Sequence, residues 1–494
     1  MAGEKRKTID ADVVIVGAGS VGSAVARMVS RYSLSSVLLE RESDVCCGTS
    51  KANNAHIVCG ADITPGLIET GIVVRSNGLY DQVTEELGVP YRRIGNCYAA
   101  LTEEEVKRLE GMRDNALKNG VNDVKIISRD EVLEMEPHLT REVKAGLWVP
   151  RDGIVSPYSL AIALCENAAR NGVRVLANQK VEEIVVEDGA VRRVVATDVV
   201  VTTRMVINCA GLFADEVSAM VGWNDFKLHP RRGEFFILDR KFRHLVNHIM
   251  YPLPNPVSRG ATICPTIDDN VLIGPTAVDV TDKFDRGTTA EGLSQVMGSV
   301  SKYYPEIKPW MAVTQYAGLR PAGAPDFIIG RHHEVAGFIN AAAIRSTGIS
   351  ACLGIAERVR DLLAEVMKLT EKPGYEPRRP AVRPFSGLSL EEKDALTAKD
   401  SRHRKVVCRC ETVTEGEILD AIHRNPAASD LDAVKRRTRA GMGRCQAGFC
   451  RPRVMEILSR ETGTPMTKVT LRGPGSEVLT RPTKQAAGKP GGKS

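Results

Sequence analysis

The chain has 494 residues, too many for one ordinary hydrophobic core, so its length predicts two or three domains. Its composition, 43% hydrophobic and 26% charged, is that of a soluble globular protein, and its small net charge of +6 argues against nucleic-acid binding. No apolar run approaches the roughly 20 residues of a membrane span, and residues 1–7 lack the apolar centre of a signal peptide. Twelve cysteines without an export signal then predict the reducing cytoplasm.

The N-terminal part of the chain alternates between apolar strands and helices. Residues 11–16 are almost wholly apolar and predict a buried parallel strand. A helix is expected over residues 23–31 and a second strand over residues 36–40, which completes a βαβ unit. Further strands are expected at 93–101, 173–176 and 181–186, and further helices at 103–119, 159–171, 290–303 and 347–367. This order predicts an α/β fold with a mixed sheet inserted between about 220 and 315.

A glycine-rich turn joins the first strand to the first helix. Its sequence, Gly17-x-Gly19-x-x-Gly22, is typical of a dinucleotide site when it stands between a strand and a helix. Gly17 permits the tight turn, Gly19 lets the backbone approach a pyrophosphate, and Gly22 lets the helix pack on the strand. Glu40, at the end of the second strand, is placed to accept hydrogen bonds from an adenosine ribose. The turn alone does not choose between FAD and NAD, but a single fingerprint predicts one dinucleotide.

The composition changes after about residue 370. Residues 371–404 are rich in proline and charge and predict a linker. Residues 405–465 contain helical patterns at 414–424 and 451–462 and predict a small separate domain. Residues 466–494 are basic and rich in glycine and proline, so we expect a disordered tail.

Four cysteines of this small domain form two close pairs. Cys408 and Cys410 are two positions apart, and Cys445 and Cys450 lie in a glycine-rich stretch. Four thiolates brought together suit a [2Fe–2S] cluster or a zinc ion, and backbone N–H groups near the glycines can hydrogen-bond anionic sulfurs. A disulfide is disfavoured in a reducing compartment. The basic run at residues 435–439 either offsets the negative charge of a cluster or is a solvated helix face.

Five short motifs are spread over the longer part of the chain: Gly48-Thr-Ser-Lys-Ala-Asn53, Arg232-Gly-Glu234, Gly274-Pro-Thr276, Gly318-Leu-Arg-Pro321 and Phe338-Ile-Asn340. Together they resemble the D-amino-acid-oxidase superfamily of FAD enzymes, and within it the branch of glycerol-3-phosphate dehydrogenase and L-2-hydroxyglutarate oxidase. Residues 205–215, an apolar strand that breaks at Gly211, are similar to the strand that precedes the flavin in such proteins.

The cysteine segment carries a second resemblance. Cys408-Arg-Cys410-Glu-Thr-Val-Thr and residues 436–445 are similar to the bacterioferritin-associated-ferredoxin type of [2Fe–2S] domain. Such a domain is fused to anaerobic glycerol-3-phosphate dehydrogenases and to some opine and proline dehydrogenases. The resemblance favours a [2Fe–2S] cluster over zinc, and with the flavin motifs it covers residues 10 to 465.

These resemblances imply an α/β fold: a Rossmann-like FAD-binding domain with an inserted mixed β-sheet substrate domain, followed by a small helical [2Fe–2S] domain. The FAD-dependent oxidoreductase domain is expected over residues 10–370, with FAD-binding parts at about 10–90, 150–220 and 316–370 and substrate-domain parts at about 91–149 and 221–315. The last helix would begin at Gly348, and its N-terminus would stabilise negative charge on the reduced flavin. The residues expected to bind FAD are Gly17, Gly19, Gly22, Glu40, Thr49, Ser50, Gly211, Gly318, Leu319 and Gly348.

The sequence departs from this family near the expected substrate site. Relatives have a histidine where this chain has Val58, and a histidine stands two residues earlier, at His56. In an extended segment His56 would point to the same side as Val58, so it is either a substitute base or a hydrogen-bonded structural residue. Arg345 stands where relatives often have a neutral residue or glutamate, and it either attracts an anionic substrate or forms a surface salt bridge.

Flavin-dependent dehydrogenation needs a base for the O–H or N–H proton and an anchor for the remote end of the substrate. Arg320 is the first candidate anchor, because a guanidinium binds carboxylate or phosphate with two hydrogen bonds. A buried ion-pair role is its structural alternative, and Arg232 is the second candidate anchor. Tyr251 and Thr266 are expected on strands that line the same cavity.

The sequence therefore predicts an FAD-dependent dehydrogenase that oxidises a small anionic hydroxy compound similar to glycerol 3-phosphate. Electrons would leave through the [2Fe–2S] cluster to an electron-accepting protein subunit, flavoprotein or quinone-linked, which could hold the chain at a membrane. A 2-hydroxyacid such as 2-hydroxyglutarate, an amino acid or an opine is the alternative substrate. A non-catalytic electron-transfer subunit, favoured only by Val58, and a redox-sensing ferredoxin fusion are alternatives of another class.

Overall fold

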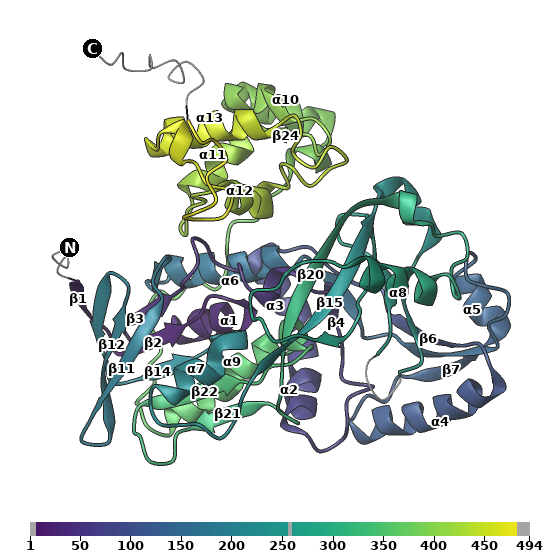
Figure 1. Cartoon of the computed structure of the whole chain (residues 1–494), viewed down its shortest axis with the longest axis horizontal. Coiled ribbons are helices and arrows are strands. Elements are labelled where there is room, and N and C mark those ends of the chain that lie inside the picture. Colours follow the sequence, from purple (N-terminus) through teal and green to yellow (C-terminus); the bar gives the residue numbers. More distant parts are fainter. Residues whose placement is uncertain (1–5, 255–258, 482–494) are drawn as a thin grey trace, which may run out of the picture. The chain divides into compact units, whose positions relative to one another are not determined.

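The computed structural model describes residues 6–254 and 259–481, and these form two compact units (Figure 1). The first unit comprises the described residues up to Arg41 and from Val45 to Ala381. The second comprises Glu42–Asp44 and the described residues from Val382 onward.

A six-stranded sheet forms the centre of one half of the first unit. Four neighbouring pairs are parallel, and only the edge strand β21 runs antiparallel to its neighbour. The strands, in spatial order, are β10 (Arg174–Leu176), β3 (Ser36–Leu39), β2 (Val13–Val16), β14 (Val206–Asn208), β22 (Phe338–Ala342) and β21 (Ile328–Arg331). Helix α1 (Ser20–Val29) connects β2 to β3, so the predicted βαβ unit is confirmed.

The two faces of this sheet pack against different layers. Along β2, Val13 and Ile15 point to one face and Val14 and Val16 to the other. The first face packs against helices, namely α1, α6 (Pro157–Arg170) and α9 (Gly348–Ala364), with α2 (Ile68–Asn77) and α3 (Tyr80–Leu87) beyond them. The second is covered by a four-stranded sheet, β1 (Lys7–Asp10), β13 (Val199–Thr202), β12 (Ala190–Ala196) and β11 (Val181–Glu187), and by α7 (Ala214–Ala219). Burial on both faces explains why β2 is apolar throughout.

A nine-stranded mixed sheet forms the other half of this unit, as the sequence predicts. Its main path is β19 (Val278–Asp279), β15 (His229–Leu238), β18 (Val271–Gly274), β17 (Thr262–Pro265), β16 (Ile249–Pro252), β6 (Asn96–Ala100), β8 (Ala145–Val149) and β7 (Lys125–Ser128), and β20 (Ala312–Ala322) pairs with β15. Within it, β16 and β6 are parallel. The helices that pack on it are α4 (Glu103–Lys118), α5 (Arg129–Met135) and α8 (Ala290–Val300).

Two strands differ from the expectation. Strand β20 pairs with β15 from Ala312 to Ala322, so the start of the segment assigned to FAD binding at 316 belongs to the nine-stranded sheet. The single strand expected at 93–101 is two strands, β5 (Tyr91–Arg93) and β6. Gly95 interrupts it with a φ of +72°, and a Cβ there would overlap the Trp148 ring. β5 joins β4 (His56–Ile57) and β9 (Gly153–Val155) in a three-stranded sheet.

The second unit consists of short helices around a small apolar core. The helices are α10 (Leu390–Lys399), α11 (Glu415–His423), α12 (Leu431–Thr438) and α13 (Arg451–Thr462), and the strands β23 (Val406–Cys408) and β24 (Val413–Thr414) pair antiparallel. Ile418, Val434 and Leu458 are among its buried core residues. The helices expected at 414–424 and 451–462 are confirmed as α11 and α13.

The segment predicted to be a linker contains a helix. α10 begins after Ser389, whose hydroxyl accepts the N–H of Glu392 while the Glu392 carboxylate accepts the N–H of Ser389. This capping box supplies partners for N–H groups at the helix start. The prolines that favoured a linker lie before it, between residues 373 and 384.

The predicted disordered tail is also partly ordered. Val469 is buried in the core of the second unit, and Thr470 pairs with Glu477 in an isolated bridge. Residues 482–494 lie outside the described part of the chain.

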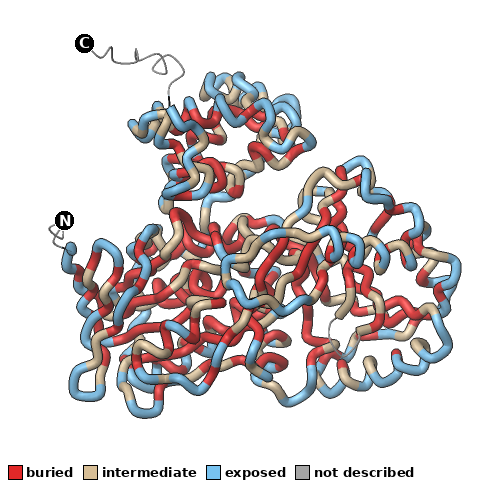
Figure 2. Tube along the Cα trace, in the orientation of Figure 1, coloured by how far each residue is buried: buried red, intermediate tan, exposed pale blue. Residues whose placement is uncertain are grey.

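Buried residues follow the strands of both large sheets, whereas α4 turns most of its residues to solvent (Figure 2). Across residues 6–254 and 259–481, no helix combines the length and apolarity needed to cross a bilayer.

Candidate functional site

The glycine turn after β2 leaves no room for side chains. A Cβ on Gly22 would lie 1.8 Å from the carbonyl oxygen of Gly17, and a Cβ on Gly17 would lie 2.6 Å from that of Cys209. Gly17 also has a φ of +98°, which favours glycine. The turn therefore brings β2, α1 and the end of β14 together as a dinucleotide fold requires.

The start of α1 is prepared for an anion. Gly19 is its N-cap and provides no side-chain hydrogen bond, and the first turn has no acidic residue. The hydroxyl of Ser50 accepts the N–H of Ser20 at 2.9 Å, so Ser50 lies against this helix start. The Glu40 carboxylate accepts the N–H of Ala18 at 2.7 Å, so this expected ribose ligand also holds the glycine turn in shape.

The other residues expected to bind FAD come from both large sheets, since Gly318 and Leu319 lie within β20 of the nine-stranded sheet. Thr49 donates its hydroxyl hydrogen bond to the carbonyl of Leu319 at 2.6 Å. Gly318 approaches the chain closely, since a Cβ there would lie 1.9 Å from the Ala52 carbonyl oxygen. Gly211 follows β14 with a φ of +58°, and Gly348 is the first residue of α9.

These residues fit FAD by their chemistry. Two helices, α1 and α9, begin without an acidic residue in the first turn, so their N–H groups and dipoles favour negative charge. Glycines without room for a Cβ line the approach to α1. Gly17, Gly19 and Gly22 would hold the pyrophosphate, Glu40 the ribose, and the start of α9 the flavin end.

Among the described residues, Arg320 is a cation that forms no ion pair with a carboxylate, and the Asp279 carboxylate that acts on it is bound to Arg231. Among the described residues its hydrogen bonds go to carbonyl oxygens, with Nη2 donating to Thr276 at 2.7 Å and Nε to Arg231 at 3.5 Å. Burial, and then the nearby cations Arg231 and Arg259, lower the pKa of Arg320 to about 10. Arg320 stays charged near neutral pH, and an added anion would relieve this unfavourable environment.

The other two candidate arginines are already paired. Arg232 donates to Asp285 at 2.6 Å and lies 3.3 Å from the Glu234 carboxylate, so its structural environment does not favour the anchor role. Arg345 forms an ion pair with Glu69, as the salt-bridge alternative predicted. Neither arginine has the unpaired character of Arg320.

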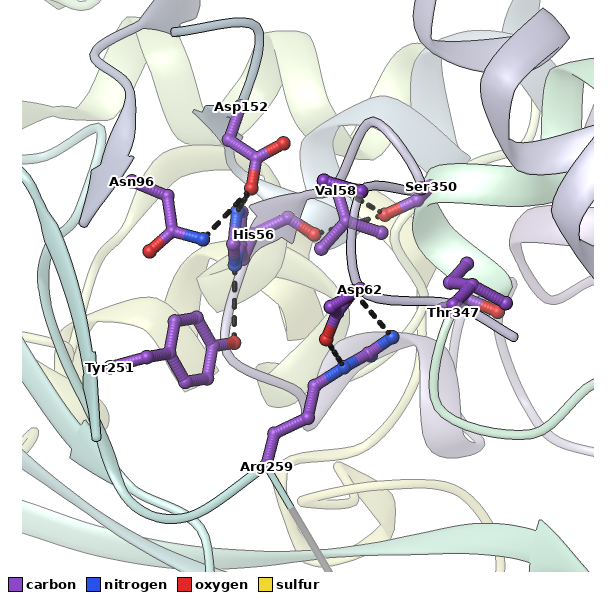
Figure 3. Close-up of polar contacts among 12 residues, drawn as sticks. His56, Val58, Asp62, Asn96, Asp152, Tyr251, Arg259, Thr347 and Ser350 are labelled. Carbon is purple, nitrogen blue, oxygen red and sulfur yellow. Dashed lines mark hydrogen bonds and ion pairs between the residues drawn. The ribbon is translucent and has the colours of Figure 1, made fainter. Parts of the chain in front are cut away.

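His56 is held in a buried network (Figure 3). Its Nε2 lies 2.9 Å from Oδ2 of Asp152, and its Nδ1 lies 3.1 Å from the Tyr251 hydroxyl. The side chain of Asn96 donates to the same carboxylate at 3.2 Å, and the N–H of Cys59 donates to its other oxygen at 2.7 Å. Burial raises the pKa of Asp152, but the His56 ring and the hydrogen bonds from Cys59 outweigh it and leave the pKa below its usual value.

Asp152 is the residue that the sequence analysis missed. It lies between β8 and β9 in Arg-Asp-Gly, a sequence typical of a turn. The antiparallel pairing of β4 with β9 brings it to His56 from 96 positions away. Nothing in a single sequence indicates this pairing.

Val58 and Tyr251 lie beside His56, whereas no described contact joins Thr266 to it. The N–H of Val58 donates to the Ser350 hydroxyl at 2.9 Å, which ties β4 to the first turn of α9. Tyr251 lies on β16 and is buried, as expected of a strand residue. Thr266, by contrast, follows the end of β17, and its hydroxyl accepts the N–H of Asn270 at 3.1 Å.

Another arginine, Arg259, lies beside this network and is paired with Asp62 (Figure 3). Its Nη2 donates to Oδ1 of Asp62 at 3.1 Å. The charge of Arg259 acts on both Tyr251 and Arg320. Tyr251, Arg259 and Arg320 therefore belong to one electrostatic neighbourhood.

In the second unit the four cysteines form two sulfur pairs. Cys410 and Cys445 have their sulfurs 3.5 Å apart, and Cys408 shares a hydrogen bond with Cys450. In the described part of the chain, no three His, Cys, Asp or Glu side chains are grouped as ligands of one metal ion. Two thiol pairs suit a binuclear cluster, in which each iron takes two thiolates.

One sulfur of each pair is favoured as a thiolate. The Cys450 thiol and the N–H groups of Gly441 and Glu411 lower the pKa of Cys408, and the N–H of Phe449 lowers that of Cys445, whereas the pKa values of their partners Cys450 and Cys410 are raised. The basic run at 435–439 is not simply a solvated face, because the side chains of Arg436 and Arg437 are buried and pair with Asp44 at 2.6 and 2.7 Å.

Residues 12–362 match the DAO family of FAD dependent oxidoreductases. The chain belongs to this family. Residues 406–460, which contain all four of these cysteines, match the BFD-like [2Fe-2S] binding domain. This FAD dependent oxidoreductase therefore carries its own [2Fe–2S] domain, and the predictions of FAD, of a [2Fe–2S] cluster rather than zinc, and of the fold class are confirmed.

Similar proteins cover one or both modules. A glycerol 3-phosphate dehydrogenase of Caloramator mitchellensis is 41% identical over 475 residues, which is 96% of this chain and 99% of that protein. An L-2-hydroxyglutarate dehydrogenase of Caenorhabditis elegans is 32% identical over 290 residues, 56% of this chain and 66% of that protein. The FAD-bound L-alpha-glycerophosphate oxidase of Mycoplasma pneumoniae, solved after dithionite reduction, has a TM-score of 0.71 and 28% identity and covers 75% of this chain and 98% of its own.

Proposed function

We propose that this protein is a glycerol-3-phosphate dehydrogenase that oxidises the secondary hydroxyl of its substrate and delivers electrons to a partner protein. One observation carries the proposal: the 41% identity to a glycerol 3-phosphate dehydrogenase extends over 475 residues and so includes both the flavin and the cysteine modules. The match to an L-2-hydroxyglutarate dehydrogenase is shorter and less similar, with 32% identity over 56% of this chain.

Arg320 is the proposed anchor of the substrate phosphate. A guanidinium without a carboxylate partner gains most from a dianionic ligand, and its fork of donors matches phosphate oxygens. Arg259 adds positive potential on the same side, although Asp62 neutralises part of it. An uncharged polyol such as glycerol would lack this interaction and bind poorly.

His56 is the proposed base, in place of the histidine that relatives have at the position of Val58. Asp152 orients its ring and would stabilise the imidazolium that forms when a proton arrives. FAD, when bound, accepts the hydride from the substrate carbon. The start of α9, tied to β4 through Ser350, favours the negative charge that accompanies flavin reduction.

Cys408, Cys410, Cys445 and Cys450 are the proposed ligands of the cluster. A [2Fe–2S] cluster transfers electrons singly, so it suits delivery to another protein rather than direct use of dioxygen. An electron-accepting subunit, flavoprotein or quinone-linked, is the proposed partner. We place the protein in the cytoplasm because reduced cysteines are the rule there.

An anaerobic substrate screen tests the proposal. Glycerol 3-phosphate should bleach the oxidised-flavin band at ~450 nm within one mixing experiment, whereas 2-hydroxyglutarate, amino acids and opines should not. If another compound alone bleached the flavin, that compound and not glycerol 3-phosphate would be assigned as the substrate. If no compound bleached the flavin while dithionite did, the protein would be a non-catalytic electron carrier.

A further inference from the structure

The hydrogen bonds of His56 determine which ring nitrogen carries its proton. Asp152 is buried and ionised, and a carboxylate only accepts hydrogen bonds. The hydrogen between them therefore sits on Nε2 of His56, 2.9 Å from Oδ2. In the neutral ring Nδ1 is then an acceptor, so the Tyr251 hydroxyl, 3.1 Å away, donates to it.

The Tyr251 oxygen has two lone pairs, and the side chains of Asn54 and Thr262 lie beside it. The side chain of Asn54 donates to it at 2.8 Å, which fixes the hydroxyl from a second direction. The ring of Tyr98 stacks on that of Tyr251, with centroids 5.5 Å apart, and holds it in place. Burial raises the pKa of Tyr251, so the hydroxyl is neutral at physiological pH.

Tyr251, rather than His56, is the member of this chain of hydrogen bonds that is left to meet a substrate hydroxyl. Both side chains are buried, but both ring nitrogens of His56 are occupied, whereas the Tyr251 hydroxyl donates to His56 and can accept more than one hydrogen bond. Tyr251 interacts electrostatically with both Arg259 and Arg320, the two cations of the proposed phosphate site. Figure 3 shows the order along the chain, with His56 between Asp152 and Tyr251 and Arg259 on the Tyr251 side.

We propose that Tyr251 contacts the substrate hydroxyl and relays a proton from it to His56. His56 then acts as a base only through Tyr251. The substrate O–H proton moves to the Tyr251 oxygen while the Tyr251 proton moves to Nδ1 of His56. FAD, when bound, would supply the hydride acceptor, so the substrate C–H bond would break as the C=O bond of the ketone forms. Asp152 holds the resulting imidazolium. The proposal rests on the proposed function and explains how the chain dispenses with a histidine at Val58, because Tyr251 approaches from the nine-stranded sheet instead.

The test is the anaerobic rate of flavin reduction by glycerol 3-phosphate in Tyr251→Phe, His56→Gln and the double variant. Each single change should slow reduction by about 100-fold or more, the scale of general acid–base catalysis, and the double variant should lose little more than either one. Tyr98→Phe is the matched control. The Tyr98 ring stacks on Tyr251, but among the described residues its hydroxyl forms no hydrogen bond to His56. FAD content and melting temperature should stay near those of the wild type.

A second measurement uses the wild type alone. Two protons move together in the relay, so the reduction rate should depend on the deuterium fraction of the solvent along a curve rather than a straight line. A straight line, or a Tyr251→Phe variant with normal rate beside an inactive His56→Gln, would overturn the relay. If the fold-losses in rate of the two single variants multiplied in the double variant, Tyr251 and His56 would act independently, which would also overturn the relay. If a different hydroxy compound reduces the flavin and Tyr251→Phe still loses that rate, the relay stands and only the substrate assignment fails.

Discussion

Arginines of the same type have different chemical settings in this protein. Arg232 and Arg345 are neutralised by Asp285, Glu234 and Glu69, whereas the described hydrogen-bond partners of Arg320 are carbonyl oxygens. The carboxylate that acts on Arg320, Asp279, is already bound to Arg231. A cation in that setting costs free energy until an anion arrives. The difference lies in three-dimensional neighbours, so the sequence could propose Arg320 and Arg232 together but could not rank them by pairing.

Replacing Arg320 tests this distinction. Arg320→Ala should lower kcat/KM for the anionic substrate. The expected loss of transition-state stabilisation is roughly 3 kcal/mol or more, the scale of a lost charge pair. FAD content should not change. Arg75→Ala is the control, since Arg75 is exposed and pairs with Glu357 on the surface. Unchanged kinetics in Arg320→Ala would move the anchor to Arg259.

At the scale of elements, the start of α1 can approach a ligand closely because glycines there carry no Cβ. A Cβ on Gly19 would already lie 3.0 Å from the Ser50 hydroxyl. Gly19→Val should therefore fill the space expected for the pyrophosphate and yield protein without FAD, measured as the ratio of absorbance at ~450 nm to protein. Gly111→Val in α4 has open space around it and should keep its flavin. A normal flavin ratio in Gly19→Val would contradict the placement of the pyrophosphate.

Sequence patterns located elements well where local chemistry decides them. The helix expected at 451–462 has those bounds in α13, and the one expected at 103–119 is α4, which starts with a capping box at Thr102. They failed where a contact between residues distant in sequence determines the bounds of an element. Gly95 is an example, because it packs on Trp148 and divides an expected strand in two. Asp152 is the most consequential example, because only the pairing of β4 with β9 reveals that it orients His56.

The helix α10 was missed for a different reason. Its Ser389-x-x-Glu392 signal is present in the sequence, but the nearby prolines made the whole of 371–404 resemble a linker. In that region a local signal outweighs average composition.

At the scale of the whole molecule, two redox modules in one chain predict that substrate oxidation and electron delivery can be separated. Cys445→Ser should lose the two irons and two labile sulfides of the cluster and slow electron delivery to an acceptor protein. Flavin reduction by substrate should persist, because hydride transfer takes place in the first unit. Zinc in place of iron after anaerobic purification would contradict the cluster assignment. So would a folded variant that lost flavin reduction as well.

The most direct test of a dehydrogenase with an internal electron exit is an anaerobic titration with glycerol 3-phosphate, followed by absorbance and electron paramagnetic resonance. We predict that the substrate bleaches the flavin and also produces the signal of a reduced [2Fe–2S] cluster. About three electrons per chain should be taken up, two by the flavin and one by the cluster. A flavin and cluster that stay oxidised with glycerol 3-phosphate but are reduced by dithionite would contradict the account.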